Sequence, residues 1–130
     1  MAFDMALDHP REFSAVGVFS GSFWWRSKDL EKGYVEEVDR IMHAKIRTKK
    51  RDAQLRIFLQ TGQLDETADR NKNGIIDSID DTLGIMDELI KLGYTPHEQI
   101  TYLELEDGKH DVETWGRVMP QFLQWLIGVK

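Results

Sequence analysis

The order in which short apolar runs alternate with helix-patterned stretches constrains this chain more than any other feature. Residues 15–20, 55–59 and 100–105 are apolar-rich runs of strand length, separated by longer stretches with apolar residues at helical spacing. Runs of this kind are typical of strands that are buried on both faces of a parallel sheet. Because parallel strands are joined by helical crossovers, the order predicts a three-layer α/β fold with about three parallel strands.

Four stretches carry the apolar stripe of an amphipathic helix. The first ends before Pro10, because proline disfavours α geometry in the residue before it, and the third ends near Leu92, where Gly93 is the expected C-terminal glycine. The stripes consist of residues 2–7; of Val35, Val38, Ile41, Met42 and Ile46; of Ile79, Leu83, Met86, Leu89 and Ile90; and of Trp115, Val118, Met119, Phe122, Leu123 and Leu126. Residues 1–130 are therefore predicted to form a single domain.

Composition narrows the class of partner. The 17 Lys and Arg residues are outnumbered by 23 Asp and Glu residues, which gives a net charge of −6. This balance argues against a general affinity for nucleic acid or for an anionic membrane. The chain has no cysteine, so disulfides, thiolate metal sites and a cysteine nucleophile are excluded. Neither a signal peptide nor a transmembrane helix is evident.

Polar loops follow each predicted strand, and in an open α/β sheet such loops carry the functional groups at the carboxyl ends of the strands. The first loop is Ser20-Gly21-Ser22-Phe23-Trp24-Trp25, the second contains residues 62–66, and the third is Gly108-Lys109-His110-Asp111. An acid and a histidine therefore occupy successive loops on one edge of the sheet. That is the chain order in which α/β-hydrolases present the last two members of their catalytic triad.

Four segments together resemble the esterase D and enterochelin-esterase group of α/β-hydrolases. They are His9-Pro10-Arg11-Glu12-Phe13, the Ser20 to Trp25 segment, Gly62 to Glu66, and Gly108 to Asp111 with Trp115. Each is weak by itself, but the four stand in the right order with strands between them and cover nearly the whole chain. The resemblance implies the C-terminal portion of an α/β-hydrolase fold, with a partial sheet, and implies hydrolysis of carboxylic esters by the complete protein.

The resemblance also implies roles for individual residues. His110 would be the general base that takes a proton from a serine and returns it to the leaving alcohol, and Asp65 would orient the imidazole. Glu66 is the alternative acid. Trp24 and Trp25 would form the wall of an acyl or aromatic pocket, with core packing as the other reading, whereas the hydroxyls of Ser20 and Ser22 are expected to hydrogen-bond locally.

The nucleophile serine of the family is missing from this sequence. That serine belongs to a Gly-x-Ser-x-Gly turn, and none of the serines at positions 14, 20, 22, 27 and 78 has glycine two residues before and after it. The first strand also lacks a neighbour on its open side. We therefore expect a fragment that is inactive alone, binds an ester substrate only together with a missing N-terminal half, and forms a homo-oligomer through the exposed sheet edge. A start codon assigned too late is an alternative.

A second motif predicts a structural calcium ion. The ligands would be Asp69, Asn71, Asn73, Ile75 through its carbonyl, Asp77 and Asp80, at positions 1, 3, 5, 7, 9 and 12 of an EF-hand-like loop with Gly74 at position 6. The plainer alternative is a turn whose Asp77 or Ser78 caps the next helix. This motif supports the rival function, a non-catalytic calcium-binding or interaction module derived from an α/β-hydrolase.

Overall fold

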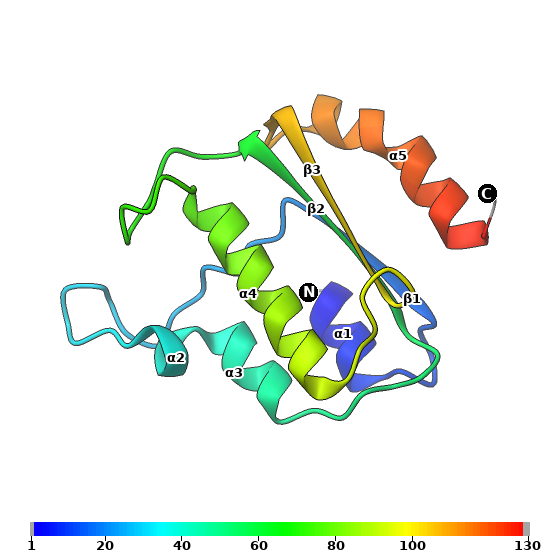
Figure 1. Ribbon diagram of the computed structural model, residues 1–130, viewed down its shortest axis with the longest axis horizontal. Helices are drawn as coiled ribbons and strands as arrows, with labels where there is room; N and C mark the ends of the chain where they lie inside the picture. Colours follow the sequence, from blue (N-terminus) through cyan, green and yellow to red (C-terminus); the bar gives the residue numbers. More distant parts are fainter. Residues whose placement is uncertain (1, 129–130) are drawn as a thin grey trace.

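Three parallel strands form the centre of the molecule, which a computed structural model describes over residues 2–128 (Figure 1). They are β1 (Ala15–Phe19), β2 (Arg56–Leu64) and β3 (Ile100–Lys109), in the order β1-β2-β3. Helices alternate with them along the chain and cover both faces of the sheet. The predicted three-layer α/β fold with about three parallel strands is therefore confirmed.

Two of the strands are longer than the sequence predicts. The register pairs Phe19 of β1 with Gln60 of β2, and beyond that pair β2 and β3 run on together to Leu64 and Lys109. Polar residues hide this extension in the sequence, although Gln60 and Thr61 are fully buried in the central strand. The added length carries the carboxyl ends of β2 and β3 past the end of β1.

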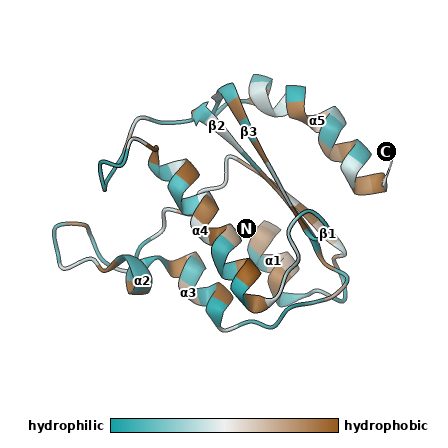
Figure 2. Ribbon diagram, viewed as in Figure 1, coloured by the Kyte–Doolittle hydropathy of each residue, from teal (hydrophilic) through white to brown (hydrophobic). Residues whose placement is uncertain are grey.

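One face of the sheet is covered by α1 (Ala2–Asp8), α3 (Ile41–Arg47) and α4 (Asp77–Leu92) (Figure 1). Figure 2 shows polar and apolar residues interleaved along α4, as expected for a helix with one face on a core. The largest side chains buried in this layer include Phe3, Ile46, Leu55, Ile57, Leu59, Ile85 and Leu89. This core holds the helical layer against the sheet.

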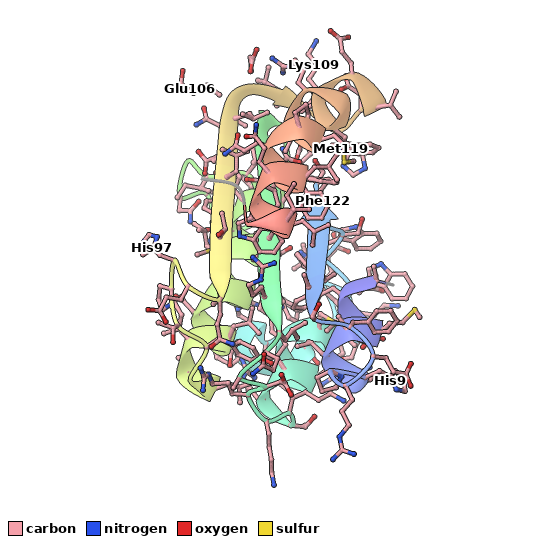
Figure 3. All side chains as sticks on the ribbon, turned by 90° about the vertical axis from the view of Figure 1, so that its right-hand side faces the viewer. His9, His97, Glu106, Lys109, Met119 and Phe122 are labelled. Atoms are coloured by element: carbon pink, nitrogen blue, oxygen red, sulfur yellow. The ribbon has the colours of Figure 1, made fainter. Side chains whose placement is uncertain are left out.

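The opposite face is covered by α5 (Val112–Ile127), which lies across the strands (Figure 3). Phe122 packs edge-on against Phe19 and Phe58, with ring centroids 5.4 and 5.3 Å apart. Gly17 makes this contact possible, because a Cβ there would collide with the Phe122 ring. The predicted closing helix is confirmed, and Pro120 does not interrupt it.

The helix predicted from the stripe at residues 35–46 is wrong in its extent. The segment forms α2 (Glu36–Asp39) and α3, separated by Arg40 in an extended conformation that bridges to Arg26. Val38 is 66% exposed, and Val35 and Ile41 are exposed as well. The break rotates the two halves out of a common helical phase, so only Met42 and Ile46 of the predicted stripe reach the core.

The ends of α4 show one confirmed and one wrong prediction. Gly93 caps its C-terminus with a left-handed φ of 107°, as the sequence indicates. At the other end the N-cap is Ile76, without a side-chain hydrogen bond, and Asp77 is already the first helical residue. Asp77 does not cap because its carboxylate binds Arg70 instead. Among the helices within residues 2–128, none is long and apolar enough to cross a membrane.

Candidate functional site

Asp65 follows directly after β2, and both oxygens of its carboxylate are held. Oδ1 accepts a hydrogen bond from the Ser20 hydroxyl at 3.1 Å, and Oδ2 accepts one from the backbone N–H of Gly62 at 3.0 Å. Gly62 can lie this close because it has no side chain: a Cβ there would collide with the carbonyl of Gly108 on the neighbouring strand. The carboxylate is therefore fixed at the carboxyl edge of the sheet.

His110 directly follows β3 and stands at the start of α5. The next residue, Asp111, caps that helix by accepting the backbone N–H of Thr114 at 2.8 Å, and this hydrogen bond lowers the pKa of Asp111. The His110 ring meets the ring of Trp115 edge-on, with centroids 5.2 Å apart. The position of the imidazole is therefore set by the capping residue that follows it and by its contact with the Trp115 ring.

The predicted acid and histidine line one pocket of about 270 Å³. Its lining residues are Ser20, Gly21, Ser22, Trp24, Asp65, Glu66, Ser78 and His110. The three loops predicted to meet at the carboxyl edge therefore do meet. Asp65 and His110 share this pocket, but within residues 2–128 no hydrogen bond joins them.

The residues around the pocket differ from their predictions in two respects. Trp24 lines the pocket and Trp25 does not; both are 55% exposed, so core packing is wrong for them. Ser20 does not hydrogen-bond locally, because its side-chain partners are Asp65 and the indole N–H of Trp115. A serine at a strand end gives no sequence signal for such distant partners, and the contacts of Ser20 with Asp65 and Trp115 emerge only from the fold.

The segment that carries Trp24, residues 21–35, leaves the sheet after β1 and is largely exposed. It is anchored at Ser27, whose N–H donates to the Asp39 carbonyl at 2.8 Å and whose hydroxyl donates to the Asp39 carboxylate at 2.6 Å. The pocket wall formed by Trp24 is therefore attached to the helical layer, whereas Asp65 and His110 are attached to the sheet.

The predicted calcium loop folds back on itself. The carboxylate of Asp69 accepts backbone N–H groups from Asn73 at 3.1 Å and Gly74 at 2.9 Å. Asp80 accepts hydrogen bonds from the side-chain amides of Asn71 at 3.1 Å and Asn73 at 2.9 Å. Gly74 has a left-handed φ of 83°, which a glycine adopts without strain. Four of the predicted ligands are therefore close together.

Asp77 departs from the predicted ligand set. Its Oδ1 accepts a hydrogen bond from the backbone N–H of Arg70 at 2.9 Å and forms an ion pair with the Arg70 guanidinium at 2.9 Å. Ile75 donates its N–H to the Asn73 side chain at 2.9 Å. Within residues 2–128, no group of three or more Asp, Glu or His side chains is arranged to hold a metal ion. The calcium ion stays a prediction.

Arg70 belongs to a buried charge network that anchors the same loop. Its guanidinium also binds Asp81 at 2.8 Å and pairs with Glu36. The imidazole of His43, which is fully buried, donates from Nε2 to the Asp81 carbonyl at 2.8 Å. Burial lowers the pKa of His43 to about 4 and raises the pKa of Asp81 to about 6 despite the nearby arginines.

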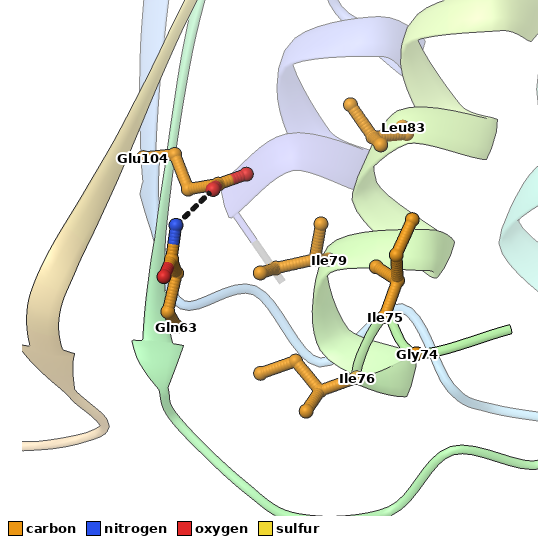
Figure 4. Close-up of a pocket in the computed structure, with 7 residues that line it drawn as sticks. All are labelled: Gln63, Gly74, Ile75, Ile76, Ile79, Leu83 and Glu104. Atoms are coloured by element: carbon orange, nitrogen blue, oxygen red, sulfur yellow. Dashed lines mark hydrogen bonds between the residues drawn. The ribbon is translucent and has the colours of Figure 1, made fainter. Parts of the chain in front are cut away.

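A second pocket, of about 330 Å³, lies between α4 and the ends of β2 and β3 (Figure 4). Ile75, Ile76, Ile79 and Leu83 form its apolar side, while Gln63 donates to Glu104 at 2.7 Å on the strand side. It shares no lining residue with the pocket of Asp65 and His110.

The parallel sheet with helices on both faces is that of a partial α/β-hydrolase. The model of the family described as "Putative esterase" matches residues 1–126, and the chain therefore belongs to this esterase family. Neither the curated proteins nor the solved structures gave a match.

Proposed function

We propose that this chain supplies the acid and the histidine of a serine hydrolase that cleaves carboxylic esters, of the esterase D and enterochelin-esterase kind. The observation that carries the proposal is the pocket in which Asp65 and His110 meet at the carboxyl ends of adjacent parallel strands. Membership of the esterase family supports the same chemistry.

In the proposed reaction His110 removes the proton from a serine hydroxyl as its oxygen attacks the ester carbonyl carbon. The carbonyl-to-alkoxy bond then breaks, and the leaving alcohol takes that proton from the imidazolium, which leaves an acyl-serine for water to hydrolyse. Asp65 stabilises the imidazolium and fixes the ring orientation. Asp65 suits this role better than Glu66, because its carboxylate is held by Ser20 and Gly62.

The nucleophile serine is proposed to come from a segment outside this sequence, which contains no Gly-x-Ser-x-Gly turn. The oxyanion hole would come from the same segment, because its donors follow the nucleophile and an earlier loop. The chain alone is then inactive, and the exposed edge of β1 is where we propose that a second copy of the chain pairs.

The pairing of acid and histidine is tested by nitrogen-15 NMR of the imidazole at alkaline pH. The proposed role requires the His110 ring to turn into a hydrogen bond with Asp65 in solution, a contact that the structure does not contain, and an amide accepts an imidazole N–H less strongly than a carboxylate does. We therefore expect His110 to populate one neutral tautomer in the wild-type chain and a mixture in Asp65→Asn. Glu66→Gln is the matched control and should resemble wild type. An unchanged His110 tautomer in Asp65→Asn contradicts the assignment of the acid.

Inactivity of the chain alone is tested by fluorophosphonate labelling, read by intact mass and peptide mapping beside an active serine esterase. We expect no adduct on any serine of this chain. A covalent adduct would reveal an activated nucleophile within the 130 residues and would refute the proposal that the nucleophile lies elsewhere.

The second candidate function is calcium binding by residues 69–80. It is favoured by the way Asp69, Asp80 and the amides of Asn71 and Asn73 gather at one point. A bound ion would take over these oxygens and rigidify the loop between Asp65 and α4, without entering the ester chemistry. Calorimetric titration with Ca²⁺ should give saturable binding that Asp69→Asn weakens; an absence of binding heat and of any calcium-dependent change in melting temperature would exclude this function.

A further inference from the structure

One side chain connects the acid loop with the helix that follows the histidine. The Ser20 hydroxyl donates to Oδ1 of Asp65 at 3.1 Å, and the same oxygen accepts the indole N–H of Trp115 at 3.1 Å. Trp115 lies in turn edge-on against His110. Asp65 and His110 have no hydrogen bond to each other. In the structure they are connected through Ser20 and Trp115 instead.

The backbone at Ser20 is held in an unfavourable conformation. Its φ is 46°, in the left-handed region that residues other than glycine, asparagine and aspartate rarely adopt. The residue is only 5% exposed, and its N–H donates to the Gln60 carbonyl at 2.8 Å. Such strain persists where surrounding contacts over-determine it, and it concentrates at functional sites. Here the left-handed turn brings the hydroxyl between the ends of β2 and α5.

We propose that Ser20 and Trp115 are positioning residues that keep the Asp65 carboxylate and the His110 ring in a fixed relation. The inference rests on the proposed function, because it concerns the same acid and histidine. Ser20 occupies one lone-pair direction of Oδ1, and Gly62 occupies Oδ2, so the carboxylate is prevented from rotating. Trp115 uses its single N–H on Ser20 and its ring on His110, which links the orientation of the imidazole to that of the acid.

The experiment compares three variants of the full chain. Ser20→Ala removes the hydroxyl and with it both hydrogen bonds, and it keeps the Cβ. Trp115→Phe removes only the N–H and keeps an aromatic ring beside His110. Ser22→Ala is the matched control, because Ser22 lines the same pocket and no hydrogen bond of its hydroxyl is found within residues 2–128.

Two NMR signals are recorded for each variant. The first is the exchange rate of the Trp115 indole N–H, which Ser20→Ala should raise by about five-fold, the equivalent of one hydrogen bond of about 1 kcal/mol. The second is the tautomer of neutral His110, which should change from a single form to a mixture in Ser20→Ala and in Trp115→Phe. A purely structural role for Ser20 would not alter the His110 tautomer.

Ser22→Ala should leave both signals unchanged. If Ser20→Ala and Trp115→Phe keep the single tautomer while Asp65→Asn loses it, the positioning role is refuted and the acid–histidine pair stands. If Asp65→Asn also keeps the single tautomer, both proposals are refuted. Should Ser20→Ala fail to fold, judged by loss of dispersed amide signals, Trp115→Phe decides alone, because its side chain is only partly buried.

Discussion

Lowering the pH should remove stability that His43, whose imidazole is fully buried, contributes to the fold. Its pKa falls from 6.5 to about 4 on folding because burial disfavours the charged ring, and the nearby Arg40 adds to the effect. The folded state therefore binds the proton less readily than the unfolded state does. A group of this kind contributes stability above pH 6.5, and that contribution is lost progressively as the pH falls toward 4.

The size of the effect follows from the same two pKa values. At about 1.4 kcal/mol for each tenfold difference in proton affinity, the full loss is about 3 kcal/mol, of which about 2 kcal/mol is lost by pH 5. Asp81 acts in the opposite direction over nearly the same range, because its pKa is raised from 3.8 to about 6. The wild-type pH profile alone therefore conceals the contribution of His43.

The His43→Gln variant isolates the contribution of His43, because Asp81 is present in both proteins. Glutamine keeps a donor for the Asp81 carbonyl but does not titrate. The free energy of unfolding is measured in urea for both proteins at pH 7 and pH 5. Between these pH values wild type should lose about 2 kcal/mol of stability relative to the variant. The control is His9→Gln at an exposed position, for which this relative loss should be small. Parallel pH profiles for wild type and His43→Gln would refute the reasoning.

Two further predictions concern the residues that anchor the site, and a third concerns the oligomeric state. Arg70→Met should lower the free energy of unfolding measured in urea by about 3–5 kcal/mol, because Asp77 loses its buried partner and Asp81 loses the nearer of its two, at 2.8 Å against 3.6 Å to Arg40; a loss below about 1 kcal/mol, as for a surface ion pair, would contradict this. Gly62→Ala should destabilise by at least about 1–3 kcal/mol, since a Cβ meets the Gly108 backbone, whereas Gly116→Ala, where a Cβ meets nothing, should not; equal melting temperatures would refute the close approach. Light scattering should show a dimer or larger species, because β1 pairs only with β2 among the described residues; a stable monomer would count against pairing at this edge.

The fold was largely predictable because the spacing of apolar residues indicates most of its strands and helices. The failures have physical causes. Gln60 and Thr61 are polar yet fully buried, so a reading based on apolar runs ends β2 too early. The stripe from Val35 to Ile46 fits a single helix, but the extended backbone of Arg40 breaks it. Such a break depends on a tertiary bridge to Arg26, which no local pattern reveals.

The location of the candidate site was predictable, but its hydrogen bonds were predictable only in part. Parallel strands bring their carboxyl ends to one edge, so loops bearing Asp65 and His110 had to meet there, and they line one pocket. The contacts of Ser20 were not predictable, because Asp65 and Trp115 are 45 and 95 residues away in the chain. The same limit applies to Asp77, which fits the spacing of a calcium ligand but binds Arg70.

The separate attachment of residues 21–35 has a consequence for altering this protein. Trp24 reaches the pocket from a largely exposed segment that is anchored at Ser27 and Asp39, while Asp65 and His110 are rooted in the sheet. The neighbour of Trp24, Phe23, is 2% exposed and packs against Phe3 in the core, so position 23 tolerates little change, whereas Trp24 is 55% exposed. Varying residue 24 alone would thus change one wall of the pocket and leave Asp65 and His110 where they are.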